Sequence, residues 1–151
     1  MITGYETAVS SLAPATGAAY VNFWSPTRRA KVREVGIFNS SATTTLPQLQ
    51  LIRTSARGTQ TTTVTPTAAA NAQDTADLAP TAVVDTAWSV QPTFAAIPMR
   101  MTDVAGTVGS GLIWNWQSDG ELIVPIGAGL ALLNNSGGTT AIVRVYFVWG
   151  E

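Results

Sequence analysis

Carboxylates and tryptophans are the residues of this chain whose types and spacing could support chemistry, because the sequence contains neither histidine nor cysteine. Without those two residue types, a Ser-His-Asp triad, a Cys-His pair and a metal site with His or Cys ligands are excluded. Asp119 and Glu121 flank Gly120, and two carboxylates on one strand face could cleave a glycosidic bond. The same stretch is also typical of a hairpin turn that leads into a strand. We therefore interpret the two acids as solvated and predict no enzymatic activity.

Oxygen ligands for a Ca²⁺ ion are offered by Asp74, Asp77 and Asp85. Their spacing lacks the dense Asp, Asn and Gly pattern of a dedicated calcium loop, which favours solvated acids or a charge near a helix N-terminus. No glycine-rich loop leads into a strong helix with a lysine, so a nucleotide cradle is not predicted either. The sequence therefore predicts neither a metal ion nor a cofactor.

Two of the five tryptophans, Trp114 and Trp116, stand two residues apart. On a strand their side chains share one face, and an aromatic face can stack on pyranose rings. Tryptophans at strand positions of a small β protein are more often found in the core or in a subunit interface, which is the interpretation we favour. Carbohydrate or receptor binding, as in a module of a phage tail or fibre, stays open as the alternative function.

The basic cluster consists of Arg28, Arg29, Lys31 and Arg33. It could meet an acidic neighbour in an assembly, or it could be a solvated loop with one ion pair to Glu34. Charged residues make up only 11% of the chain and the net charge is −1, which is too little positive charge to hold nucleic-acid phosphates. We do not predict a nucleic-acid partner.

The low charge also bears on self-association, because a lone soluble monomer usually carries more charge to stay dispersed. A surface of Thr, Ser, Asn, Gln and Ala suits a protein that is largely covered by copies of itself or by other proteins, although it is also common in secreted or thermally sturdy β domains. No stretch has the roughly 18 consecutive apolar residues of a membrane helix, and the first 20 residues lack the basic and apolar regions of a signal peptide. No membrane partner is predicted.

Short strands are the elements that must position these residues. Alternation is clearest near the C-terminus, where Ala141, Val143, Val145, Phe147 and Trp149 face one way and polar or mixed residues face the other. Turn residues recur at short intervals, which predicts a single-domain, all-β, jelly-roll-like antiparallel β-sandwich. The expected strands are Tyr5–Ser10, Ala18–Trp24, Val32–Asn39, Leu49–Thr54, Thr59–Thr65, Ala87–Phe94, Ile97–Met101, Gly111–Gln117, Glu121–Val124, Gly129–Asn134 and Thr139–Trp149.

Several connections carry specific predictions. Arg57-Gly58 predicts a hairpin into the polar strand Thr59–Thr65, which we expect to be an edge strand or an inter-subunit surface. Asn134-Asn135 before Ser136-Gly137-Gly138 predicts a tight hairpin with positive φ. Residues 1–17 form either an N-terminal arm or a first strand, and residues 18–151 form the sandwich. Within the sandwich, residues 66–80 are an Ala/Thr-rich excursion that fits a short helix capped by Thr67 or an ordered loop.

Four blocks of the sequence, taken in their order, resemble a group of small virion proteins of tailed bacteriophages. No catalytic signature accompanies these blocks, and residues 66–80 match none of them. The blocks are REVGIFN (Arg33–Asn39), GSGLIWNW (Gly109–Trp116), GELIVPIGAGLAL (Gly120–Leu132) and VYFVWGE (Val145–Glu151).

The group resembles capsid cement or decoration proteins, and the resemblance implies a jelly-roll-like sandwich that clamps the head shell as a homotrimer. It implies the major capsid protein as partner and the outer surface of the capsid as location, with synthesis in the host cytoplasm. A rigid, sparsely charged sandwich can stabilise a shell by contact alone. Residues for such contacts come from the first strand, the basic cluster, the polar strand and the tryptophan pair: Tyr5, Arg28, Arg29, Thr61, Thr63, Trp114 and Trp116.

Overall fold

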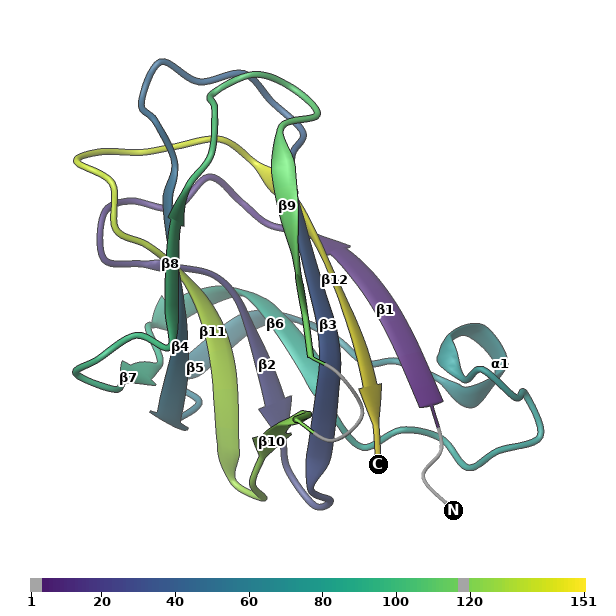
Figure 1. Cartoon of the computed structure of the whole chain (residues 1–151). Helices are drawn as coiled ribbons and strands as arrows, with labels where there is room; N and C mark the ends of the chain where they lie inside the picture. The colour runs from purple at the N-terminus through teal and green to yellow at the C-terminus, as the bar shows by residue number, and fades with distance from the viewer. Residues whose placement is uncertain (1–3, 117–119) are drawn as a thin grey trace.

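Two antiparallel sheets face each other across a hydrophobic core in the computed structural model, which describes residues 4–116 and 120–151 (Figure 1). The predicted antiparallel β-sandwich is therefore confirmed. The five-stranded sheet has the order β1 (Gly4–Ser10), β12 (Val143–Gly150), β3 (Ala30–Asn39) and β10 (Leu122–Val124), with β9 (Gly111–Asn115) also paired to β3. The seven-stranded sheet has the order β5 (Thr59–Val64), β6 (Val83–Val90), β2 (Ala19–Ser25), β11 (Ala128–Asn134), β4 (Gln48–Ala56) and β7 (Thr93–Phe94), with β8 (Arg100–Asp103) also paired to β4.

The chain passes from one sheet to the other after β1, β2, β3, β8, β10 and β11. Repeated crossing of this kind is typical of a jelly-roll-like sandwich, and it brings the two ends of the chain together. β1 pairs with β12 along its whole length, from Gly4 opposite Gly150 to Ser10 opposite Arg144. On its other side β12 pairs with β3, so the last strand is a central strand of its sheet.

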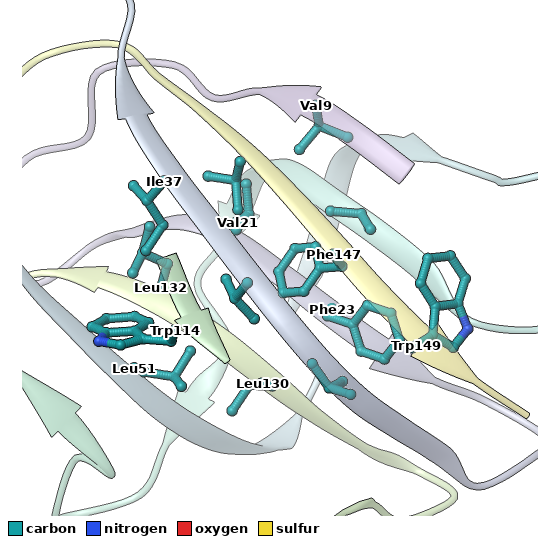
Figure 2. Close-up of a cluster of buried hydrophobic side chains, with 14 of the residues drawn as sticks. Val9, Val21, Phe23, Ile37, Leu51, Trp114, Leu130, Leu132, Phe147 and Trp149 are labelled. Atoms are coloured by element: carbon teal, nitrogen blue, oxygen red, sulfur yellow. The ribbon is translucent and has the colours of Figure 1, made fainter. Parts of the chain in front are cut away.

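The core confirms the predicted alternation of the last strand. Val145, Phe147 and Trp149 are buried, whereas Arg144 is exposed and Tyr146 is half-buried. Phe23 of the opposite sheet lies between the two large side chains of β12 (Figure 2), with ring centroids 5.1 Å from Phe147 and 5.2 Å from Trp149. These contacts join the two sheets, and aromatic pairs at such distances add to the stabilisation from burial.

Two predicted hairpins are wrong. Gly58 does turn the chain, with φ of +75°, but β4 and β5 do not pair with each other, because β5 pairs with β6 instead. β11 and β12 belong to different sheets, so residues 135–142 form a crossover. Among the described residues no residue other than glycine has a positive φ, and the predicted turn conformation at Asn134 is not adopted. Its side-chain amide instead donates to the carbonyl oxygens of Pro14 and Gly138 at 2.9 and 3.0 Å.

The polar strand β5 is an edge strand, as predicted, and its pairing with β6 shifts register repeatedly. The predicted strand Ala87–Phe94 is divided, because β6 ends at Val90 and β7 begins at Thr93 after Gln91-Pro92. Proline lacks the N–H that a continuing ladder would use.

The excursion 66–80 contains one short helix, α1 (Ala68–Asn71), and is otherwise irregular. Thr67 occupies the N-cap position but makes no capping hydrogen bond with its side chain. The excursion covers the outer edge of β1, where Tyr5 and Ala72 form a bridge and the Gln73 N–H donates to the Gly4 carbonyl at 2.8 Å. Residues 4–10 are therefore a paired strand. No helix in the described part of the chain is long and apolar enough to cross a membrane.

Candidate interaction surfaces

The tryptophan pair lies between the sheets. Trp114 is only 8% exposed, and Trp116 packs against the same core. The Arg100 guanidinium lies 4.6 Å from the Trp116 ring centroid, a distance at which a cation is attracted to the ring face. A pyranose ring has no open platform on the face that Arg100 covers. Trp114 belongs to the core, which is one of the two interpretations that the sequence favoured, whereas Trp116 is only partly buried. Through Arg100, Trp116 connects the end of β9 in one sheet to β8 in the other.

Of the two candidate carboxylates, the structure describes only Glu121. Asp119 lies outside the described residues, and the strands on either side of it both pair with β3 and do not pair with each other. The Glu121 carboxylate accepts a hydrogen bond from the Arg33 Nε at 2.6 Å and lies 3.8 Å from the Lys31 ammonium. Lys31 and Arg33 of the basic cluster therefore pair with Glu121. The alternative of an ion pair to Glu34 is not what the structure shows, because the Glu34 carboxylate accepts hydrogen bonds from Asn115 and Tyr146.

Asp85 is fully buried and cannot join Asp74 and Asp77 around a cation. Arg57 donates to both of its oxygens, at 2.7 and 2.8 Å, and the Thr63 hydroxyl donates to one of them at 2.6 Å. Hydrogen bonding to Asp85 raises the pKa of Arg57, against the opposing effect of burial. Within residues 4–116 and 120–151 no three acidic side chains are grouped so that they could hold a metal ion. The ion pair of the partly exposed Arg57 with the buried Asp85 instead joins the two-residue link between β4 and β5 to β6.

The remaining candidate contact residues fall into two groups. Tyr5 is 0% exposed, and its hydroxyl donates to the Leu78 carbonyl at 2.8 Å, so this side chain lies inside the molecule. Arg28 and Arg29 are exposed in the turn between β2 and β3. Thr61 is exposed on the edge strand β5, as is Thr63 apart from the hydroxyl that reaches Asp85. The structure thus leaves the turn and the β5 edge on the surface and removes Tyr5 and Trp114 from it.

The Glu151 side chain is a buried anchor that the sequence did not reveal. Its carboxylate is 0% exposed and accepts hydrogen bonds from the backbone N–H groups of Thr81 and Ala82 at 2.9 and 2.8 Å. The Thr81 hydroxyl donates at 2.9 Å and the Trp149 indole N–H at 3.2 Å. Arg28 stands 3.9 Å away. One carboxylate thus connects residues 81–82 to the last core strand. In the sequence, the only indication of this role was a glutamate close to a tryptophan that was expected to be buried.

The outer face of the five-stranded sheet carries a tyrosine that leans on its neighbour. The Tyr146 ring lies over Gly36, where a Cβ would overlap it. A glycine within a strand often marks such a close approach, and here it makes room for the ring. The Tyr146 hydroxyl donates to the Glu34 carboxylate. Desolvation, together with the hydrogen bond to Glu34 and the charges of Glu34 and Glu6, raises the pKa of Tyr146 to about 12.

One side of the sandwich, which we call the open side, is formed by β7, β8, β9, β10 and the segment between β7 and β8 (Figure 1). The two sheets meet there through Arg100 over Trp116 and through Arg53, whose guanidinium donates to the Ile123 carbonyl at 2.7 Å. Large apolar side chains of these segments are exposed to solvent. They are Ile97 (79%), Met101 (67%), Ile113 (53%), Met99 (42%) and Ile123 (41%).

Ile113 and Ile123 point outward from the five-stranded sheet, Met101 points outward from the seven-stranded sheet, and Ile97 and Met99 lie in the segment between β7 and β8. These side chains therefore border the open side from both faces of the sandwich, and exposed apolar side chains of this kind are candidates for contact with another protein. These residues were not recognised from the sequence, because Met101, Ile113 and Ile123 alternate like ordinary strand residues, and Ile97 and Met99 were expected in a strand where the structure has an irregular segment. Comparison with known proteins gives no relative: no family model, no curated protein and no solved structure matches the chain.

Proposed function

We propose that the chain is a non-enzymatic structural subunit of a tailed-bacteriophage virion, a capsid cement or decoration protein that stabilises the head shell through contacts between subunits. The open side carries this proposal, because its exposed isoleucines and methionines would be stabilised by another protein surface. Only 11% of the residues are charged, which is compatible with a surface that is covered in an assembly.

The resemblance to virion proteins gains a structural rationale from β3. The blocks 33–39, 109–116 and 145–151 contribute to β3, β9 and β12, and the block 120–132 contributes β10 and β11. β3 pairs with β12, β9 and β10, so the four blocks meet around one strand. Residues that recur together in a family are expected to be neighbours in its fold, and this arrangement supports the proposal.

The alternative function, carbohydrate binding at Trp114 and Trp116, has no structural support. Trp114 is buried, and Arg100 covers a face of Trp116. We therefore keep glycans only as a control in the experiment below.

The test is co-sedimentation of the purified chain with expanded, DNA-free capsids of the phage that carries it. The expected result is saturable binding that unlabelled chain competes away, together with a higher temperature of capsid disruption. Host glycans serve as the parallel ligand and are expected to leave the tryptophan fluorescence unchanged. A chain that stays in the supernatant at saturating capsid concentration would refute the cement function, and a glycan-dependent fluorescence shift would replace it with the alternative.

A further inference from the structure

The open side carries two cations beside its apolar residues. Arg53 donates to a backbone carbonyl and Arg100 stacks on Trp116, and neither is paired with a carboxylate in the part of the chain that the structure describes. Of the acids nearby, Glu121 is already shared by Lys31 and Arg33, and Asp103 lies at the far end of β8, opposite Gln48. The open side therefore carries two cations between the sheets, bordered by exposed apolar side chains of both sheets.

The opposite side of the sandwich, which we call the acidic side, consists of β1 and the excursion 66–80 that covers it. Figure 1 shows α1 beyond β1 at one side of the molecule and β7 and β8 at the other. Glu6, Asp74 and Asp77 provide the charge, the excursion contains no Lys or Arg, and none of the three acids has an ion-pair partner among the described residues. Leu78, which is 70% exposed, adds an apolar side chain to this side.

The two sides are complementary in charge, and both present apolar side chains. We propose that the open side of one copy binds the acidic side of the next copy of this chain. This inference specifies the self-association on which the proposed function rests. Because the paired surfaces lie at opposite sides of one molecule, the contact is heterologous. It joins copies head to tail, into a closed ring if the rotation between copies closes and into an open filament if it does not.

The geometry also defines the kind of contact. The outer edge of β1 is already bonded to residues 72–73, so the acidic side meets its neighbour through side chains and not by adding a strand. The chain exposes 7033 Å². A contribution of roughly 800 Å² on each of two sides, the size of a standard interface, would cover somewhat less than a quarter of that surface.

The first experiment measures mass by light scattering without capsids, so that its outcome is independent of capsid binding. Two variants are compared with the unchanged chain: one carries Arg53→Glu and Arg100→Glu, the other Asp74→Arg and Asp77→Arg. In each variant the dissociation constant of the assembly should rise by at least about tenfold. The chain with all four substitutions should regain the assembly, because the charges are exchanged between the two sides. Arg144→Glu on the outer face of the five-stranded sheet is the matched control and should leave the mass unchanged.

A second experiment identifies the contact without relying on charge reversal. The chain has no cysteine, so Met101→Cys and Asp77→Cys can be introduced singly, and each variant is checked by circular dichroism. A heterologous contact predicts disulfide-linked pairs when the two single variants are mixed, and none when either is oxidised alone.

Three outcomes would overturn the inference. The first is that the unchanged chain is a monomer. The second is that the charge reversals leave the mass unchanged, or that the fourfold variant does not regain the assembly. The third is that Met101→Cys alone forms disulfide-linked pairs, which indicates an isologous contact. If a monomeric chain binds capsids, this inference is contradicted and the proposed function is supported. If the chain assembles but does not bind capsids, this inference is supported and the proposed function is contradicted.

Discussion

At the residue scale, the Glu151 carboxylate accepts more hydrogen bonds than any other acid that the structure describes. Its donors come from β12 and from residues 81–82. A glutamine at this position keeps one acceptor oxygen and turns an amide N–H₂ toward N–H donors. Each hydrogen bond to a charged group contributes about 1.5–3 kcal/mol. Buried polar groups that lose their partners are costly.

We expect Glu151→Gln to lower the free energy of unfolding by at least about 2 kcal/mol, measured by urea denaturation. The matched control is Asp103→Asn, an exposed acid, for which a change within about 0.5 kcal/mol is expected. Equal effects from the two substitutions would show that the Glu151 hydrogen bonds do not contribute to stability.

Tyr146 provides a prediction about pH. Desolvation and the neighbouring carboxylates of Glu34 and Glu6 raise its pKa from 10.0 to about 12, so the folded state favours the protonated phenol. Because the folded pKa exceeds the unfolded one, this contribution to stability is fully present below pH 10 and is lost as the pH rises toward about 12.

The phenol titration, followed by ultraviolet absorbance as the difference between the unchanged chain and Tyr146→Phe, should have its midpoint near 12. Glu34→Gln removes a charge and should move that midpoint toward 10, the ordinary pKa of tyrosine. A midpoint that does not respond to Glu34→Gln would mean that desolvation alone raises the pKa.

At the element scale, β12 is the strand on which the sandwich depends, since it pairs on both sides and carries Phe147 and Trp149 into the core. Deleting residues 145–151 would remove most of a central strand, and the remaining chain is expected to unfold. Two single substitutions on opposite faces of the strand test which side chains point into the core.

Phe147→Ala should cost about 3–5 kcal/mol, because it leaves a cavity beside Phe23. Val148→Ala, one position away on the outer face, should cost less than about 1 kcal/mol. Chemical denaturation of both variants checks the expectation. Similar losses from the two substitutions would contradict the placement of the strand.

At the scale of the whole molecule, the opposite charges of the two sides make self-association sensitive to salt. Raising the salt concentration from about 0.05 to about 0.5 M shortens the Debye length severalfold. The mass measured by light scattering should then shift toward the monomer at low protein concentration. An assembly that strengthens with salt would indicate a contact held by apolar burial alone, because salts of the kosmotropic kind favour burial.

Much of the fold was predictable from local patterns. The strands at 4–10, 19–25, 30–39 and 143–150 lie close to their predicted positions, because alternation and turn residues act over a few residues. The edge position of β5 was also predictable, because a strand of Thr and Gln has little to bury. The two hairpins were wrong because a turn sequence permits a reversal without choosing the strand that will pair beyond it.

The candidate surface was less predictable than the fold. Tyr5 and Trp114 are of residue types that are common in interfaces, yet both lie in the core. Lys31 and Arg33 pair with Glu121, which the sequence did not indicate as their partner. The open side consists of residues such as Ile97 and Met101, whose exposure depends on which strand edges remain uncovered.

The sequence by itself determined the all-β class, the inward faces of its strongest strands and the exclusion of histidine and cysteine chemistry, because these follow from composition and from the two-residue period of a strand. Only the tertiary structure decided that β5 pairs with β6, that Glu151 holds residues 81–82 and that side chains such as Ile97 and Met101 are exposed. The physical reason is that pairing and exposure are set by contacts between residues far apart in the chain, which no local pattern records.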